Sequence, residues 1–374
     1  MKDKIYAVWF ANAVGINSKY TEIFCNMYSS FEEIYNLQYD EIVKIQGITK
    51  KTAQKLLDKN TDASEDILKN CIKNGIDITT FYDVKYPTVL KNIPTPPAVL
   101  YVKGQLPDFE STVSIAVVGS RKCSVYGTVM SEQISEDLGR NGITIISGMA
   151  RGIDSAAHKG ALKSGAKTIA VLGCGADIAY PAENAGLKSM IEQNGAVISE
   201  FPPGTPPLPG NFPVRNRIIS GLAEAVTVIE GKASSGSTIT ANLAKDYGKE
   251  VFCLPGNVDN PLSSASHKLI REGARLITCT ADIIEDMALY ESGRIADIIY
   301  SEEAIANKYE TAFAKLTGEQ RAIARVLSNV KPVTIDEICY KTGMEIALVN
   351  QCLFMLEIDK IVKQMPGKQY ILCL

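Results

Sequence analysis

Small and basic residues follow several short apolar runs of the chain, where they could bind a phosphate group. Gly119, Ser120 and Arg121 come directly after the first such run of the central region. Glycine permits a sharp exit from a strand, amides at the start of a helix bind anions, and arginine binds phosphate through two parallel hydrogen bonds. A second loop, residues 147–154, holds Arg151 between two glycines. These loops predict a phosphate site; the alternative is that Arg121 is an ordinary exposed arginine.

An aromatic residue stands beside basic residues in a proline-rich stretch, residues 201–217. Phe212 is followed closely by Arg215, Asn216 and Arg217. Aromatic rings stack on the bases of a single strand, and guanidinium groups hold its backbone. The combination predicts a contact with single-stranded nucleic acid. The alternative is that Phe212 packs under the loop while one arginine forms an internal ion pair.

A glycine- and serine-rich turn, residues 230–238, precedes a further expected helix. It is similar to a Walker A loop, but Ser237 stands where that motif needs a lysine, which disfavours hydrolysis of a nucleoside triphosphate. Ser235, Gly236 and Ser237 still offer hydroxyls and free amides at a helix start. The turn therefore predicts a phosphate cradle without hydrolytic machinery.

Motifs for catalysis and for metal binding are missing from the sequence. The dinucleotide-binding pattern G-x-G-x-x-G is incomplete after Gly173 and Gly175, because Ile178 occupies the position of its third glycine. There is no Ser-His-Asp order, no pair of catalytic carboxylates and no HExxH motif. The nine cysteines never form C-x-x-C, and we interpret His158, one of only two histidines, as structural. We therefore expect a protein that is not an enzyme, without cofactor or metal, that holds a phosphate-bearing ligand.

Short β-branched runs alternate with helical segments from residue 113 onward. Strands are expected over residues 113–118, 144–146, 168–172, 196–199, 226–229, 250–254 and 275–277. Helices are expected over residues 125–140, 154–164, 184–193, 213–222, 237–247 and 263–272. Apolar strands separated by helices predict an α/β fold, a parallel sheet covered on both faces. Ligands bind such sheets beyond the carboxyl ends of the strands, so the loops described above should share one edge.

The N-terminal residues 1–76 read as short helices. A helix is expected to end at Gly47 and the next to start near Thr49, which is helix-hairpin-helix (SAM-like) geometry. The exposed amides of such a turn bind a backbone phosphate; the alternative is an ordinary glycine stop in a packing domain.

The remaining boundaries follow from composition. Residues 77–290 are the expected sheet domain, which opens with a proline-rich connector and a strand over 98–102. Residues 281–310 carry eight acidic and two basic residues, and we expect an acidic linker over 291–310. Residues 311–374 predict a winged helix, with helices over 318–328, from 334 and over 345–357, followed by a terminal hairpin.

Charge and hydropathy limit the class of protein. Thirty-nine basic and forty-two acidic residues give a formal net charge of −3, which excludes a bulk basic protein that coats nucleic acid by charge alone. The apolar run Ile5–Val14 lacks a signal-peptide cleavage pattern, and no uncharged apolar stretch reaches the roughly 18 residues of a membrane span. We expect a cytoplasmic protein without membrane contact.

Several long motifs of the central region resemble the DprA/Smf family of bacterial DNA-processing proteins. They are SGMARGIDSAAHKGAL (Ser147 to Leu162), YPAEN (Tyr180 to Asn184), NFPVRNRIISGL (Asn211 to Leu222), EGKASSGSTITANLA (Glu230 to Ala244) and LPGNVDNPLSSASHKLIREGA (Leu254 to Ala274). They occur in the family's order over about residues 113–280, and the flanking regions fit as well.

The resemblance implies an extended Rossmann fold, cooperative binding of single-stranded DNA, a homodimer and the loading of RecA for recombination, as in natural transformation. It assigns the DNA pocket to three groups of residues, to which we add Arg151: Gly119, Ser120 and Arg121; Phe212, Arg215, Asn216 and Arg217; Ser235, Gly236 and Ser237. Some relatives carry a lysine near the positions of Ala182 and Pro209, neither of which is basic here.

Two other functions compete with this prediction. A phosphoribohydrolase acting on nucleoside monophosphates would need a catalytic acid, for which Glu230 is the only obvious candidate. A transcriptional regulator would use the winged helix, but residues 345–357 contain no lysine or arginine to contact a major groove. For that domain a protein contact is the better interpretation.

Overall fold

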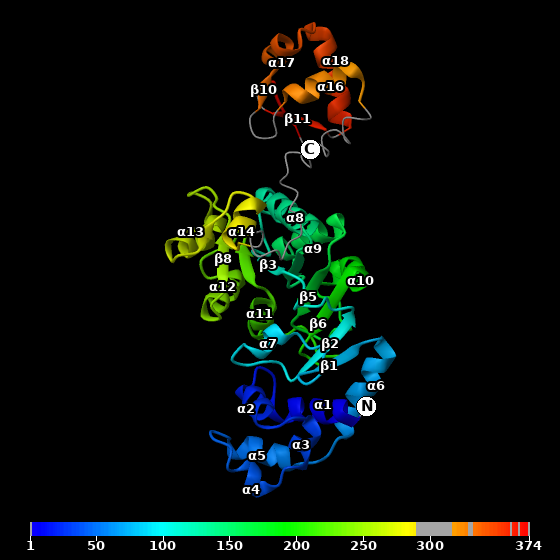
Figure 1. Cartoon of the computed structure of the whole chain (residues 1–374), viewed down its shortest axis with the longest axis vertical. Helices are drawn as coiled ribbons and strands as arrows, with labels where there is room; N and C mark the ends of the chain where they lie inside the picture. Colours follow the sequence, from blue (N-terminus) through cyan, green and yellow to red (C-terminus); the bar gives the residue numbers. More distant parts are fainter. Residues whose placement is uncertain (1, 289–315, 328–331, 360, 366, 373–374) are drawn as a thin grey trace. The chain divides into compact units, whose positions relative to one another are not determined.

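The computed structural model describes residues 2–288, 316–327, 332–359, 361–365 and 367–372 (Figure 1). It divides into two compact units, Met1–Ala296 and Asp297–Leu374. The expected acidic linker, 291–310, lies outside the described residues.

The first unit is built on a nine-stranded sheet of order β1-β2-β6-β5-β4-β3-β7-β8-β9. The strands are β1 (Asp77–Thr80), β2 (Val99–Gly104), β3 (Ser114–Val118), β4 (Thr144–Ser147), β5 (Thr168–Leu172), β6 (Gly195–Ser199), β7 (Ala225–Val228), β8 (Glu250–Cys253) and β9 (Arg275–Leu276). β3 to β9 run parallel, whereas β1 and β2 add an antiparallel edge through the pairing of β2 with β6. The order reverses between β3 and β7, which is where such sheets bind ligands.

Helices connect the parallel strands and cover the sheet. They are α7 (Thr88–Lys91), α8 (Val125–Arg140), α9 (Ile153–Ser164), η1 (Ala182–Asn184), α10 (Ala185–Asn194), α11 (Asn211–Leu222), α12 (Gly236–Asp246), η2 (Pro261–Ser263), α13 (Ser264–Arg271) and α14 (Thr280–Asp286). α8, α9 and α10 pack in one group and α11 and α12 in another, and Figure 1 shows these groups on opposite sides of the strands.

The α/β fold class predicted from the sequence is confirmed. Each expected parallel strand is present within one residue of its predicted ends, because the strands are mainly apolar and, apart from β9, nearly all of their residues are buried. The antiparallel edge is the part that the prediction lacked: β1 was not expected, and β2 was not assigned a direction. β1 reads Asp-Ile-Thr-Thr, which is too short and polar to stand out as a strand.

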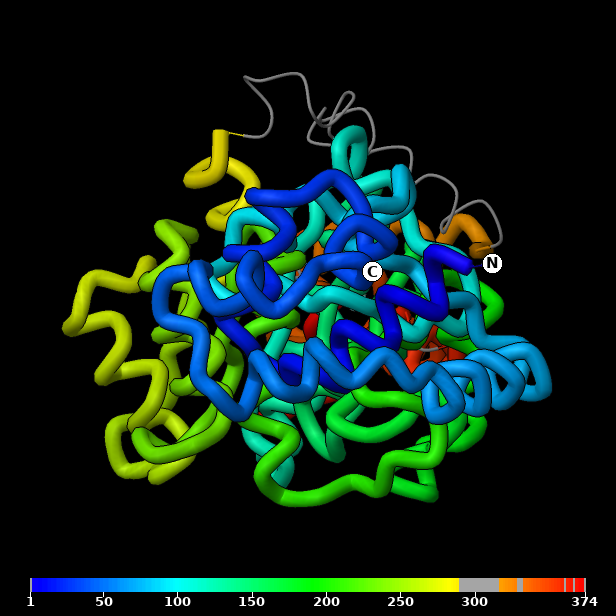
Figure 2. The backbone as a smooth tube through the Cα atoms, turned by 90° about the horizontal axis from the view of Figure 1, so that it is seen from below, coloured from blue at the N-terminus to red at the C-terminus, as the bar shows by residue number. Residues whose placement is uncertain are grey.

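The N-terminal helices are α1 (Lys2–Val14), α2 (Lys19–Met27), α3 (Phe31–Asn36), α4 (Tyr39–Ile42), α5 (Lys50–Leu57) and α6 (Asp62–Asn74). Aromatic side chains fill their core, where the rings of Phe10, Phe24 and Phe31 are fully buried. α1 contacts β1 and β2, and in the view of Figure 2 these helices, in blue, lie across the strand-bearing part of the unit.

The predicted hairpin geometry is wrong in one respect. α4 ends at Ile42 and not at Gly47, although α5 starts after Thr49 as expected. The Tyr20 hydroxyl accepts a hydrogen bond from the Thr49 amide (3.1 Å) and donates one to the Gly47 carbonyl (3.0 Å). The turn is therefore closed by an internal partner, and the Thr49 amide is not available for a phosphate.

The second unit has the predicted winged-helix composition. Its described elements are α16 (Gly318–Val326), β10 (Val333–Thr334), α17 (Ile335–Thr342), α18 (Ile346–Ile358), β11 (Val362–Met365) and β12 (Gln369–Leu372). The three strands pair in the order β10-β12-β11. β10 is only two residues long, too short for a strand to be predicted from the local residue pattern.

A search of the described residues finds no helix with the length and apolar character that crossing a membrane requires.

Candidate nucleic-acid site

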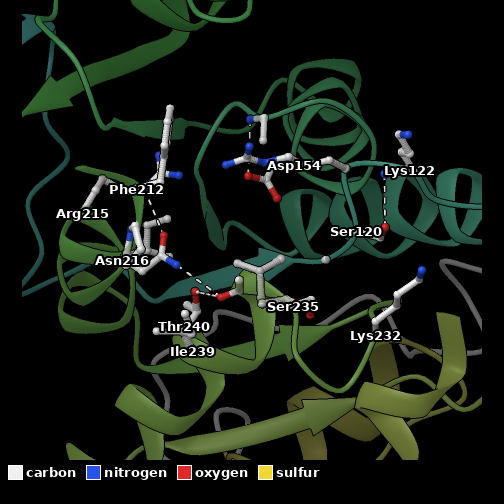
Figure 3. Close-up of a pocket in the computed structure, with 18 of the residues that line it drawn as sticks. Ser120, Lys122, Asp154, Phe212, Arg215, Asn216, Lys232, Ser235, Ile239 and Thr240 are labelled. Carbon is white, nitrogen blue, oxygen red and sulfur yellow. Dashed lines mark hydrogen bonds between the residues drawn. The ribbon is translucent and has the colours of Figure 1, made fainter. Parts of the chain in front are cut away.

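A cavity of about 870 Å³ opens at the carboxyl ends of β3 and β7, where the strand order reverses. Four cationic side chains line it, those of Arg121, Lys122, Arg215 and Lys232, against the single carboxylate of Asp154. Figure 3 shows that the labelled residues surround the pocket from the loop after β3, from α11 and from the start of α12. The loops singled out in the sequence therefore do meet at one edge of the sheet.

The loop after β3 is shaped by Gly119. A Cβ at this position would lie 2.5 Å from Cγ1 of Ile153 and 2.8 Å from the Glu230 carbonyl oxygen, so a larger residue would push α9 or β7 away. The Ser120 amide donates to the same Glu230 carbonyl (2.7 Å). These contacts fix the backbone that presents Arg121, whose side chain is exposed at the pocket.

Phe212 forms the aromatic centre of the pocket. The guanidinium carbon of Arg121 lies 4.9 Å from the centre of its ring, and the ring of Tyr180 lies 5.4 Å from it at an interplanar angle of 34°. Phe212 is partly exposed and lines the cavity. The alternative in which it packs under the loop is therefore not what the structure shows; the ring and a guanidinium face the same space.

Arg215 is buried at the floor of the pocket and fixes α11 to the sheet. Its Nη1 donates to the carbonyls of Gly148 (2.9 Å) and Val171, and its Nε donates to Oδ1 of Asn216 (3.1 Å). A Cβ on Gly148 would come within 2.5 Å of this guanidinium, which explains the glycine after β4. These carbonyls use much of the hydrogen-bonding capacity of the guanidinium. Arg215 therefore contributes mainly positive electrostatic potential to the pocket and holds α11 in position.

The electrostatics of the floor depend on Arg215 and Asp154. Burial lowers the pKa of Arg215 to about 10, and the nearby Asp154 carboxylate opposes that shift. Burial raises the pKa of Asp154, opposed by the positive charge of Arg215. Arg215 is therefore still positively charged at neutral pH, which favours an anionic ligand above it.

The start of α12 completes the lining of the pocket. The Ser235 and Ser237 hydroxyls lie 2.6 Å apart, and Ser235 precedes α12 without capping its amides through its side chain. The Thr238 amide donates to the Ser235 carbonyl (3.1 Å), whereas the first amides of a helix, here those of Gly236 and Ser237, have no partner within it and lie at the positive end of the helix dipole. Asn216 ties this turn to α11 by donating to the Gly236 carbonyl (3.2 Å).

The sequence analysis missed Lys122 and Lys232 as cations of the pocket. Both side chains are exposed and line the cavity, and Figure 3 shows Lys122 beside Ser120, apart from the turn before α12 that holds Lys232. Lys122 directly follows Arg121, and Lys232 lies within the glycine- and serine-rich turn, so both lysines belong to loops that the sequence already indicates. Pro209 also lines the cavity, and these two lysines supply positive charge that position 209 does not.

Two predicted DNA-contact residues lie outside the pocket lining. Arg151 is exposed but forms an ion pair with Glu183, with Nε 2.5 Å from Oε1 and Nη2 2.6 Å from Oε2. Arg217 is only 3% exposed, and its Nη2 lies 2.6 Å from Oε1 of Glu200. The reason is helical geometry: a step of two residues turns about 200°, so Arg217 leaves α11 on the side opposite to Arg215. The internal ion pair foreseen as an alternative is thus formed by Arg217.

Glu230, the candidate acid of a phosphoribohydrolase, is used structurally. Its carboxylate accepts hydrogen bonds from the Ser124 amide (2.9 Å) and the Ser124 hydroxyl (2.6 Å) at the start of α8. The side chain is buried and is not part of the pocket lining. The hydrolase alternative is therefore not favoured. Among the described residues, no cluster of three or more His, Cys, Asp or Glu side chains suits a metal ion.

His158 is structural, as interpreted from the sequence. It is fully buried, and its Nδ1 lies 2.7 Å from the Thr168 hydroxyl, which itself donates to the Ile145 carbonyl. Because that hydroxyl has its only proton on Ile145, Nδ1 of His158 is the donor, and Nε2 is buried without a hydrogen-bond partner. Burial lowers the pKa of His158 to about 3, and the charge of Arg215 adds to the shift.

Because His158 is buried with a lowered pKa, we expect the folded protein to lose stability at acidic pH. Between about pH 6.5 and pH 3 the unfolded chain binds a proton at His158 that the folded protein does not, so stability falls as the pH falls. At pH 5 the loss is about 2 kcal/mol. We expect the free energy of unfolding of His158→Asn, measured in urea, to fall less between pH 7.5 and pH 5 than that of the wild type. Equal losses in both proteins would contradict the assignment.

Comparison with known proteins agrees with this geometry. The family model "DNA recombination-mediator protein A" matches residues 77–288, and "DprA winged helix domain" matches residues 308–368. Protein Smf of Synechocystis sp. is 33% identical over 350 residues, which cover 87% of this chain and 88% of the relative.

Solved structures are also similar. DNA processing protein A (DprA) from Streptococcus pneumoniae matches with a TM-score of 0.67 at 35% identity, over 76% of this chain and 99% of that one. The Helicobacter pylori protein, described for its single-stranded DNA binding mode, matches with a TM-score of 0.52 at 28% identity, over 57% of this chain and 97% of its own. From its strand order, its motifs and these matches, the chain belongs to the DNA recombination-mediator protein A family, known as DprA or Smf.

Proposed function

We propose that this protein binds single-stranded DNA in the cavity between β3 and β7, with the bases stacking at Phe212 and the backbone phosphates held by Arg121, Lys122, Lys232 and the start of α12. The observation that carries the proposal is the Phe212 ring, which lines a cationic cavity beside a guanidinium 4.9 Å away. A partly exposed ring in this setting stacks on any base, without reading sequence.

The cavity suits a single strand better than a duplex. Stacking on Phe212 needs an unpaired base, and a volume of about 870 Å³ accommodates nucleotides and not a double helix. The lining provides contacts to phosphate from several elements, which is how a strand is held without sequence preference. The H. pylori relative, titled for its single-stranded DNA binding mode, supports the same ligand here.

The biological role that we propose is supported by the family. We propose that the bound strand is protected and that RecA is loaded onto it in the cytoplasm, with the protein acting as a homodimer and without a catalytic step. The family description as a recombination mediator supports this role. For the winged helix we propose a protein partner, since α18 reads IALVNQCLFMLEI and offers no cationic side chain to a DNA groove.

Replacement of Phe212 tests the proposal directly. We expect Phe212→Ala to weaken binding of a fluorescent oligothymidine about tenfold, from a stacking contribution of about 1–3 kcal/mol, and Phe212→Tyr to retain wild-type affinity. Wild-type log affinity should fall linearly with log salt, with a slope of about −0.7 per phosphate contact. Fluorescence anisotropy measures both quantities. Equal affinity for Phe212→Ala and wild type, or preference for a duplex of the same length, would end the proposal.

A further inference from the structure

The helix that carries the pocket is anchored by a different element on each side. On the pocket side of α11, Arg215 binds the carbonyls after β4 and at β5, and Asn216 binds the first residue of α12. At the C-terminal end, the Lys249 ammonium donates to the carbonyls of Ser220 (2.8 Å) and Gly221 (2.7 Å), as well as to that of Ala223. These anchors all come from the sheet and its connections.

The opposite side of α11 is held by the N-terminal helices. Nε of Arg217 donates to Oδ1 of Asn17 (2.8 Å), a residue of the loop between α1 and α2. The same Oδ1 accepts from the Thr95 hydroxyl (2.6 Å), and Asn17 has φ of 57°, a backbone conformation that asparagine tolerates better than most residues. The side chain of Asn17 therefore reaches from the N-terminal helices to the back of the pocket helix.

Arg217 depends on this contact because its ion pair is incomplete. Nη2 binds Oε1 of Glu200, but Nη1 of Arg217 and Oε2 of Glu200 are buried without a hydrogen-bond partner. Burial raises the pKa of Glu200, opposed first by Arg217 and also by the Asn17 backbone amide. With one bond to Glu200, the orientation of the guanidinium is fixed by its second bond, the one to Asn17.

We infer that Asn17 and Arg217 are positioning residues for the DNA pocket, through which the N-terminal helices hold α11 and so set the place of Phe212 and Arg215. Arg217 stands two residues after Arg215 on the same helix, so a shift of one moves the other. This inference rests on the proposed function: it concerns how tightly a strand is held in that site.

Asn17→Gly is the most direct test, because glycine accepts a φ of 57° without strain and removes only the side chain. We expect oligothymidine affinity to fall about threefold to tenfold, because the variant loses the hydrogen bonds from Arg217 and Thr95 and only part of that free energy is felt at the pocket. The salt dependence should keep its wild-type slope, since no phosphate contact is removed. In the DNA-free protein, hydrogen exchange in residues 211–222 should become faster.

Phe31→Leu provides the matched control. This ring is buried in the core of the N-terminal helices, so its truncation destabilises them without removing the Asn17 contact. It should leave oligothymidine affinity and exchange in α11 at wild-type values. Wild-type affinity in Asn17→Gly, or an equal loss in Phe31→Leu, would overturn the inference. Failure of the proposed function would appear separately, as a wild-type protein that does not bind oligothymidine. The hydrogen-exchange measurement is made without DNA and does not depend on that result.

Discussion

Arg121→Glu is expected to weaken oligothymidine binding about 100-fold at roughly 0.1 M salt. The change removes a charge-assisted contact worth about 1.5–3 kcal/mol and places a carboxylate beside the phosphates, for a total near 3 kcal/mol. It also removes the cation 4.9 Å from the Phe212 ring. The side chain is exposed, so the fold should tolerate the change. Anisotropy titrations at several salt concentrations measure the affinity and its slope.

Lys167→Glu is the matched control for this charge reversal. Lys167 is exposed and lies just before β5, at the amino end of a strand and so on the edge of the sheet away from the pocket. The net charge changes by the same amount in both variants, so any general electrostatic effect is shared. We expect Lys167→Glu to bind within about twofold of the wild type. An equal loss in both variants would mean that DNA follows overall charge and not this pocket.

The central sheet was predictable because its signal is local. Most of the parallel strands are short runs of buried, mainly apolar residues, and a glycine or serine ends or directly follows β3, β4, β5 and β6. Since parallel strands end at one edge, Arg121, Phe212 and Ser235 were placed in one site without knowledge of the strand order. β1 was missed because its stability comes from pairing with β2 and from packing against α1, which are tertiary contacts.

The roles of individual arginines were not predictable from their proximity in the sequence. Arg215 and Arg217 stand in one short motif, yet one lines the cavity and the other is buried against Glu200. The period of the helix separates them, but their partners could not be read from the motif, because Asn17 lies two hundred residues away. Arg151 likewise stands in a loop at the correct edge and is neutralised by Glu183.

The motif NFPVRNR therefore combines two tasks. Phe212 is partly exposed and lines the cavity, while the next polar residues, Arg215, Asn216 and Arg217, fix the helix to three different parts of the fold. Burying two arginines so close together is costly unless they are paired, and Nη1 of Arg217 is buried without a hydrogen-bond partner.

Arg217→Met is the second change with a large expected effect, and the effect is on stability. It leaves Glu200 buried without a cation, which costs about 3–5 kcal/mol of the free energy of unfolding at neutral pH. Burial already raises the pKa of Glu200, so loss of Arg217 raises it further. Protonation then relieves the penalty, and we expect a smaller loss at about pH 5 than at neutral pH. Urea unfolding at the two pH values measures it.

The double variant Arg217→Met/Glu200→Gln separates the buried charge from the role in DNA binding. Removing both charges should recover most of the lost stability, because no unpaired ion remains in the interior. If Arg217 neutralises no phosphate, this variant keeps the wild-type slope of log affinity against log salt, even where its affinity is lower because α11 has lost its contact with Asn17. A slope whose magnitude is smaller by about 0.7 would instead show that Arg217 contacts a DNA phosphate, as its sequence motif implies. If Arg217→Met alone were as stable as the wild type, the ion pair of Arg217 with Glu200 would not be what holds α11 in place.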